Sequence, residues 1–130
     1  MANELSRREK QLAATASEHE LGELIKPLTR EIYLFDTYVA GTTHLLDQSV
    51  LTEIQVGDKL SLQRENNKFD EKAILIFTEK KKKLGYIPEK DNVVFSRLMD
   101  AGKLLSAKIR EINNKGSFTQ ICINIYLIDF

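Results

Sequence analysis

The pattern of hydrophobic and polar positions changes once along the chain, near residue 30. In the first part, leucine and isoleucine recur over residues 21–28 at the spacing of one helix face, and Pro27 ends or kinks that helix. In the second part, short runs of β-branched and aromatic residues alternate with turns rich in Gly, Asn and Asp, which is typical of strands. The pattern therefore predicts an N-terminal helical arm at residues 1–30 and a β domain at residues 31–130.

The second part contains six predicted strands, with one predicted helix at residues 89–101 between the fourth and the fifth. The apolar face of this helix is expected to consist of Val93, Val94, Leu98 and Ala101, with Phe95 and Met99 at its margins. Asn113–Gly116 is the expected turn between the last two strands, because asparagine and glycine tolerate positive φ. Many short antiparallel strands favour closure, which removes exposed sheet edges. The predicted fold class is mainly β (α+β), a small OB-like or SH3-like six-stranded antiparallel barrel with one inserted helix.

Charge and cysteine usage narrow the class of protein. The chain carries 19 Lys and Arg against 19 Asp and Glu, so any binding to nucleic acid would depend on a local patch. Cys122 is alone and lies in an apolar run, which excludes an internal disulfide and indicates a buried, inert thiol. The chain begins with polar residues and has no run of about 18 apolar ones, so neither a signal peptide nor a membrane span is predicted. We expect a cytoplasmic protein without membrane partners.

The residue types that catalysis requires do not cluster in the sequence. His19 and His44 fall in different segments and Cys122 falls in neither, so no zinc site is predicted. There is no Gly-x-Ser-x-Gly elbow and no glycine-rich phosphate loop. The prediction is a binding module that is not an enzyme and needs no cofactor or metal.

The polar stretch Asn66–Asp70 stands out between two predicted strands. Asn and Asp favour turns, but Phe69 has no such role and would prefer burial, so an aromatic beside the Asp70 carboxylate suggests a ligand. In the alternative interpretation, Phe69 fills the interior and Asp70 accepts loop amides. Lys80–Lys83 are similarly either a phosphate-binding patch or a solvated hairpin tip, and His44 either stacks on a base or is an ordinary loop histidine.

Three blocks of the sequence, in this order, resemble the HIRAN domain: Val39–Thr42, Gly57–Ile74 and Leu84–Pro88. The resemblance runs from about residue 35 to residue 126. That family occurs as the N-terminal module of DNA translocases and as small stand-alone bacterial and phage proteins. The resemblance implies an OB-like barrel that binds single-stranded DNA, in one eukaryotic member by capturing a free 3′ end. It also implies a role in DNA repair beside a helicase or nuclease partner.

The resemblance also implies roles for individual residues. Phe69 and Phe118 fall where aromatic rings stack on terminal bases, Asp70 where a carboxylate accepts a hydrogen bond from the 3′ hydroxyl, and Asn67 at the adjoining polar position. Arg64 and Lys72 flank this loop and could face the same groove. The complete set of candidate nucleic-acid-binding residues is Thr43, His44, Arg64, Asn67, Phe69, Asp70, Lys72, Tyr86 and Phe118.

The sequence departs from the family pattern at several of these positions. Thr43, His44 and Leu45 stand where the eukaryotic member has an arginine and two aromatic residues. Tyr86 replaces a histidine, and Glu89 replaces a lysine and would repel a phosphate. Binding to single-stranded nucleic acid in general, DNA or RNA, is therefore the broader prediction.

The alternative function is a protein-interaction or self-association adaptor with a degenerate DNA-binding face, in which the helical arm at residues 1–30 pairs with a second copy. The nucleic-acid hypothesis carries a structural requirement that the adaptor hypothesis lacks. It expects Phe69 and Phe118 to share one open groove beside Asp70.

Overall fold

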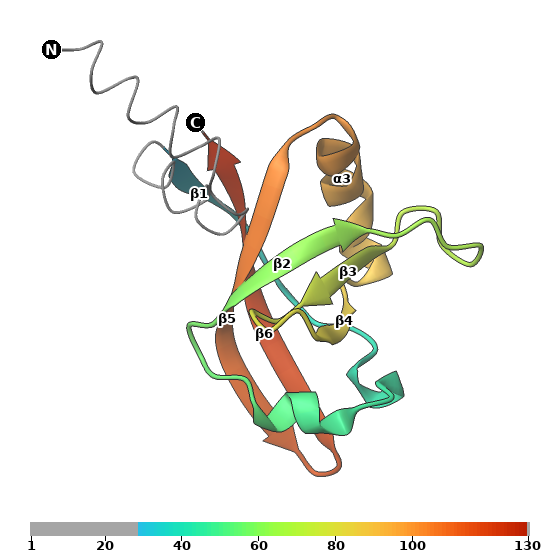
Figure 1. The fold of residues 1–130 in the computed structure, drawn as a ribbon, viewed down its shortest axis with the longest axis vertical. Helices are drawn as coiled ribbons and strands as arrows, with labels where there is room; N and C mark the ends of the chain where they lie inside the picture. The colour runs from blue at the N-terminus through green and yellow to red at the C-terminus, as the bar shows by residue number, and fades with distance from the viewer. Residues whose placement is uncertain (1–28, 130) are drawn as a thin grey trace, which may run out of the picture. The chain divides into compact units, whose positions relative to one another are not determined.

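The computed structural model describes residues 29–129, and the predicted helical arm falls outside them up to residue 28. Within the described part, six strands and one α-helix follow the predicted order (Figure 1). Two short 3-10 helices, η2 (Thr42–His44) and η3 (Gln48–Thr52), lie between the first two strands. The other elements are β1 (Arg30–Tyr38), β2 (Lys59–Arg64), β3 (Ile74–Phe77), β4 (Lys83–Tyr86), α3 (Glu89–Asp100), β5 (Leu104–Lys115) and β6 (Phe118–Asp129).

The strands form one antiparallel sheet with the order β1-β6-β5-β2-β3-β4, curled into a half-barrel. Its two edges are joined where the chain leaves β1. Val39 N–H donates to the Ile121 carbonyl on β6, at 2.9 Å, and Ala40 exchanges two hydrogen bonds with Tyr86 on β4, at 2.8 and 2.9 Å. The predicted mainly β fold with antiparallel strands and one helix is confirmed, but as a half-barrel, because β1 does not pair with β4 and only Ala40, beyond the end of β1, forms a single bridge to it.

The interior is built from alternate residues of the long strands. On β6, Ile121, Ile123 and Ile125 are fully buried, and Ala107 and Ile109 of β5 face the same core. Burying an isoleucine side chain stabilises a fold by about 1.5–3 kcal/mol. The alternation predicted for these strands is therefore what fixes which face of the sheet points inward.

Helix α3 has the predicted extent but a different inward face. Val94 was expected inside and is 62% exposed, whereas Phe95, expected at the margin, is buried. Two polar residues, Asn92 and Ser96, take inward positions because each side chain has a hydrogen-bond partner there. Hydrophobicity alone could not predict that face, since the helix also faces a polar loop.

The turn of the last hairpin is displaced from the predicted Asn113–Gly116. Lys115 pairs with Phe118, so the turn consists of Gly116 and Ser117, and Gly116 has a φ of 65°. Asn113 and Asn114 belong to β5 instead, opposite Gln120 and Thr119. The turn prediction was right in its use of glycine and wrong in its position.

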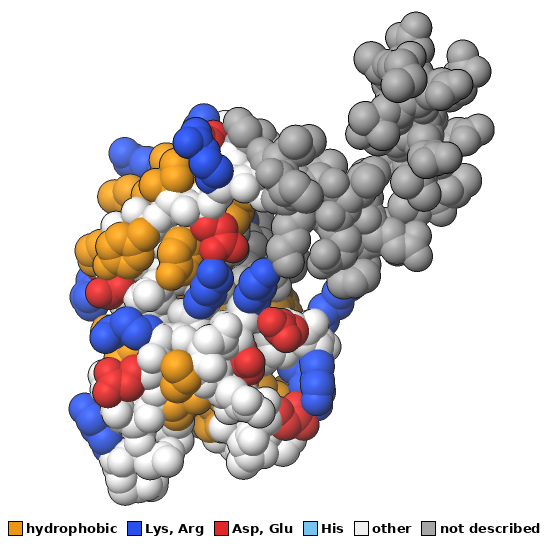
Figure 2. All heavy atoms as spheres, turned by 90° about the vertical axis from the view of Figure 1, so that its left-hand side faces the viewer, with side chains coloured by type: hydrophobic (Ala, Val, Ile, Leu, Met, Phe, Trp, Pro, Cys, Tyr) orange, Lys and Arg blue, Asp and Glu red, His pale blue; other side chains and the backbone are white. Residues whose placement is uncertain are grey.

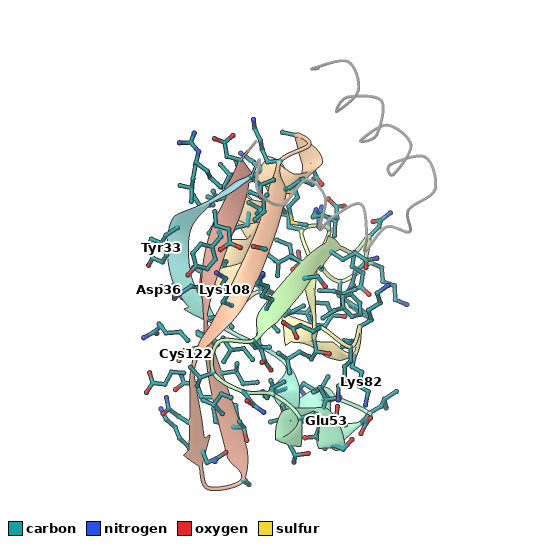
Figure 3. All side chains as sticks on the ribbon, turned by 60° about the vertical axis from the view of Figure 1, so that its left-hand side comes forward. Tyr33, Asp36, Glu53, Lys82, Lys108 and Cys122 are labelled. Carbon is teal, nitrogen blue, oxygen red and sulfur yellow. The ribbon has the colours of Figure 1, made fainter. Side chains whose placement is uncertain are left out.

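Cys122 lies on β6 beside a register irregularity and is half-buried (Figure 3). It is a free thiol and less enclosed than predicted. Within residues 29–129, no helix has the length and apolar character needed to cross a membrane.

Candidate nucleic-acid interface

The loop of residues 65–73, between β2 and β3, folds on itself through its own asparagine and aspartate. Asn67 Oδ1 accepts a hydrogen bond from the Phe69 backbone N–H at 2.7 Å. Asp70 Oδ1 accepts one from the Lys72 N–H at 2.9 Å. Such side-chain to backbone bonds two residues apart are why these residue types form turns. The local turn chemistry predicted from the sequence is therefore present in the structure.

Phe69, at the tip of loop 65–73, projects into solvent. Its side chain is 85% exposed, so the interpretation in which it fills the interior is wrong. The Lys68 ammonium lies 5.2 Å from the centre of its ring, within the range of a cation–π contact. Leaving a phenylalanine in water forgoes about 1.5–3 kcal/mol of burial. The ring is available to a ligand from solvent.

Asp70 is held from two sides. Besides the Lys72 amide at Oδ1, its Oδ2 accepts a hydrogen bond from Asn92 Nδ2 on α3, at 2.8 Å. An ionised carboxylate can accept about four hydrogen bonds, so roughly half of its capacity is used by the protein. The Asp70 carboxylate is thus held in one orientation and can still accept a hydrogen bond from a ligand.

Arg64, at the end of β2, holds the same loop from behind. Its two terminal nitrogens donate to the carbonyls of Ala73 and Glu71, at 2.6 and 2.7 Å. Its Nε donates to Asp100 Oδ1 at 2.9 Å, and its side chain is only 25% exposed. The guanidinium faces the protein and not an open groove. Lys72 is different, because it is exposed and its ammonium forms no ion pair within residues 29–129.

A second group of predicted residues gathers around Tyr86. The Lys83 ammonium lies 4.7 Å from the Tyr86 ring centre and donates a hydrogen bond to its hydroxyl at 3.2 Å. Thr43 and His44, on η2, are exposed and follow directly from the Ala40–Tyr86 bridge. The bridge thus places Tyr86 close to the η2 segment although 42 residues separate it from His44 in the sequence.

His44 lines a groove of about 340 Å³ beside η2 and η3. Leu46, on its lip, has a fully exposed side chain. Across the groove, Lys82 forms an ion pair with Glu53 at 3.1 Å (Figure 3). The groove is also lined by Leu45, Asp47, Val50 and Lys83.

Asp47 gives this groove a negative charge next to its lysines. The Ser49 hydroxyl and backbone N–H both donate to the Asp47 carboxylate and lower its pKa. On the face shown in Figure 2, basic and acidic side chains of the described residues are likewise interspersed, without a patch of one sign. Attraction of a polyanion to the groove or to the face in Figure 2 would therefore be local and sensitive to salt.

Phe118 lies away from this region. It begins β6 opposite Lys115, at the tip of the β5–β6 hairpin, and its side chain is 38% exposed. Figure 1 shows this tip and the loop of residues 65–73 well apart. The expected meeting of the Phe69 and Phe118 rings in one groove is not found, because the hairpin tip lies beyond the first residue of β2, whereas the loop of residues 65–73 follows the last residue of β2.

Two residues that support the loop, one directly and one through Arg64, are not among the candidate residues named from the sequence. Asn92 and Asp100 both lie on α3 and hold Asp70 and Arg64 respectively. A signal for Asn92 was available, because residues 92, 95, 96 and 99 share one helix face, and a polar residue on a face that also carries Phe95 and Met99 requires a partner. Among the described residues, no three His, Cys, Asp or Glu side chains gather as a metal site.

The sequence model of the HIRAN domain matches residues 32–127 of this chain. The chain belongs to the HIRAN domain family. The predicted resemblance, over about residues 35–126, is thereby confirmed. None of the curated proteins matches the chain.

Two solved structures are similar to this HIRAN domain. A protein from Lactobacillus plantarum is 28% identical, with a TM-score of 0.71 over 78% of this chain and 99% of that one. The HIRAN domain of human HLTF is 14% identical, with a TM-score of 0.62 over 78% of this chain and 79% of that one. At that lower identity the likeness shows the fold alone.

Proposed function

We propose that this HIRAN domain binds single-stranded DNA, and that the loop of residues 65–73 contacts the strand. The observation that carries this proposal is the Phe69 ring, 85% exposed on a loop that hydrogen bonds hold in place, with an oriented carboxylate next to it. A base stacked on an aromatic ring contributes about 1–3 kcal/mol, whatever its sequence. Because hydrogen bonds already hold the backbone of this loop, its ordering on binding costs less entropy than that of an unconstrained loop.

The Asp70 carboxylate is proposed to read the 3′ end. It keeps free acceptor capacity beyond the Lys72 and Asn92 donors, which suits the hydroxyl of a strand terminus. A 3′ phosphate would bring negative charge to a carboxylate that needs a donor. Strands that end in a hydroxyl should therefore bind more tightly than strands that end in a phosphate.

Phosphate contacts are assigned to exposed lysines near the loop. Lys68 lies beside the Phe69 ring, and the Lys72 side chain is exposed. Thr43, His44 and Tyr86 would form a second contact region, in which His44 lines the groove and the Lys83 ammonium covers Tyr86. In this proposal Arg64 supports the loop and does not contact the DNA. Phe118, on the β5–β6 hairpin, would contact the DNA at a place separate from Phe69.

Fluorescence anisotropy with a labelled strand of about ten nucleotides, at several salt concentrations, tests this function. Binding should weaken with salt, and Phe69→Ala should weaken it by roughly tenfold through the lost stacking. Tyr33→Ala is the matched control, since Tyr33 is an exposed aromatic, 54% exposed, on β1. Absence of binding at low salt, or equal affinity of Phe69→Ala and the unaltered protein, would reject the proposal.

A second candidate function is protein interaction, favoured by an apolar groove of about 350 Å³ between β1 and α3. Phe35 and Val94 line it, with exposures of 40% and 62%. Sedimentation at increasing protein concentration tests whether the chain associates with itself. If Val94→Asp, or deletion of residues 1–16, abolishes an oligomer in a protein that does not bind DNA, the adaptor function replaces the first proposal.

A further inference from the structure

We infer that Asn92 is the positioning residue for Asp70, and that helix α3 holds the loop of residues 65–73 in its binding conformation before any ligand arrives. The inference rests on the proposed function for its role in binding. It deepens that function, because it states what makes the loop rigid and which residue gives the carboxylate its orientation.

The first link between α3 and the loop is the Asn92 amide. Asn92 is 2% exposed, and its Nδ2 donates to Asp70 Oδ2 at 2.8 Å. A buried polar side chain is costly unless it is hydrogen-bonded, so its presence at this position calls for the bond that it forms. The Lys72 N–H fixes the other oxygen of the same carboxylate. Two donors from different elements thus set the plane of the Asp70 carboxylate.

The second link lies at the other end of α3. Asp100, the last residue of the helix, accepts a hydrogen bond from Arg64 Nε at 2.9 Å, and the Arg64 guanidinium donates to the Glu71 and Ala73 carbonyls. Hydrogen bonds to charged groups are the strong ones, and a guanidinium offers five donors in a fixed plane. The loop is therefore held through side chains at both ends of one helix.

The chain segment before α3 determines where Asn92 lies. Ile87 N–H donates to the Ile74 carbonyl of β3 at 3.0 Å, and the Pro88 carbonyl accepts from Asn92 N–H at 3.0 Å. Asn92 is thus fixed one helical turn after a corner that is itself fixed to β3. Ile87 and Pro88 thus connect β3, the strand that follows the loop, to α3, the helix that supports it.

Two substitutions at one position separate positioning from packing. Asn92→Ala removes the donor and leaves a cavity, whereas Asn92→Leu removes the donor and keeps an extended side chain. If Asn92 served packing alone, Asn92→Leu would behave like the unaltered protein. If it positions Asp70, both variants lose the orientation of the carboxylate.

Ser96→Ala is the matched control. Ser96 is also buried on α3, at 1% exposure, and its hydroxyl donates to the Val93 carbonyl within the helix, at 2.9 Å. Its removal changes a buried polar group of the same helix without touching the loop. Any effect common to Ser96→Ala and the Asn92 variants is a general loss of helix stability.

The measurement is the ratio of affinities of the full chain for a 3′-hydroxyl and a 3′-phosphate strand, together with hydrogen exchange of the Phe69 and Lys72 amides. Both Asn92 variants should bring the affinity ratio towards one and speed exchange of the Lys72 amide several-fold, and Ser96→Ala should change neither. If both Asn92 variants keep the unaltered ratio and exchange rate, the inference is overturned.

The same experiment separates this inference from the proposed function. If the unaltered protein binds no DNA strand, or binds 3′-hydroxyl and 3′-phosphate strands equally, the proposed recognition of the 3′ end is wrong. Hydrogen exchange of the Lys72 amide then tests by itself whether Asn92 positions Asp70. Faster Lys72 exchange in the Asn92 variants than in Ser96→Ala then supports the inference, and equal exchange rejects it.

Discussion

Gly85 passes so close to Ala40 that a Cβ atom at position 85 would lie 2.4 Å from the Ala40 carbonyl oxygen. The same two segments carry the hydrogen bonds between Ala40 and Tyr86 that join the edges of the half-barrel. A glycine is required here because the nearest atom belongs to the backbone and cannot move aside, and the Val39 Cγ1 methyl would lie 2.5 Å from the same Cβ position. The joined edges in turn keep Tyr86 beside the segment that carries His44.

This contact predicts a large loss of stability on Gly85→Ala. The backbone must move to relieve the clash, which would weaken the Ala40–Tyr86 bridge and cost about 2–4 kcal/mol. Urea unfolding measures the change in the free energy of unfolding. Gly102→Ala is the control, because Gly102 has a φ of 90° but no neighbour near its Cβ position, so strain alone should cost about 1–2 kcal/mol. Equal losses in the two variants would show that the close approach is unimportant.

The separation of Phe69 from Phe118 predicts additive effects on strand binding. If both rings contact DNA at separate places, the free-energy changes of Phe69→Ala and Phe118→Ala should add in the double variant within about 0.5 kcal/mol. The measurement is a double-mutant cycle by fluorescence anisotropy with one short strand. A coupling energy well above about 1 kcal/mol would mean that the rings act on the same base, contrary to their positions in the fold.

Replacing Glu89 is predicted to increase the affinity for single-stranded DNA and to lower the stability of the fold. Glu89 is exposed in the first turn of α3. Its carboxylate stabilises the helix by about 0.3–1 kcal/mol through the helix dipole, but it repels phosphate. Glu89→Lys should therefore lower the midpoint of thermal unfolding slightly and tighten binding of a single strand.

The salt dependence shows whether this gain is a phosphate contact. Each new contact should make the slope of log K against log salt more negative by about 0.7. Glu111→Lys, the same charge change on β5, is the control, since Glu111 is exposed and outside the proposed interface. If Glu111→Lys tightens binding as much as Glu89→Lys does, the gain reflects net charge and not a contact at α3.

The ion pair between Lys108 and Glu31 predicts that the stability of the fold changes at high pH, where Lys108 loses its proton. The hydrogen bond to the Glu31 carboxylate raises the pKa of Lys108 in the folded protein. A raised lysine pKa stabilises the fold below the unfolded value of about 10.4, and this contribution is lost as the pH rises through the folded value. Because the pair is partly exposed, the contribution should be below about 1 kcal/mol.

An NMR titration of the Lys108 side chain measures this pKa directly. Glu31→Gln should lower its midpoint, because the raised pKa of Lys108 comes mainly from the hydrogen bond to Glu31. A midpoint that does not change on Glu31→Gln would show that the pair is not formed in solution.

The sequence by itself determined the order and type of the secondary structure in the β domain. Alternation in β5 and β6 selects one buried face, Ile87 and Pro88 separate β4 from α3, and the asparagine and aspartate of loop 65–73 dictate its turns. These features depend on residues close together in the chain, so their physical causes can be recognised in the sequence. The family resemblance was visible in the same local blocks.

Only the tertiary structure decided which distant residues meet. The outward direction of Phe69, the use of Arg64 inside the loop, the inward face of α3 and the distance to Phe118 all depend on how the sheet curls and where the helix packs. A polar side chain such as Asn92 is stable inside only because Asp70 lies opposite it, 22 residues away in the sequence. Spacing along the chain carries no information about that distance in space. The loop could therefore be recognised in the sequence, whereas the residues that hold it in place could be identified only in the structure.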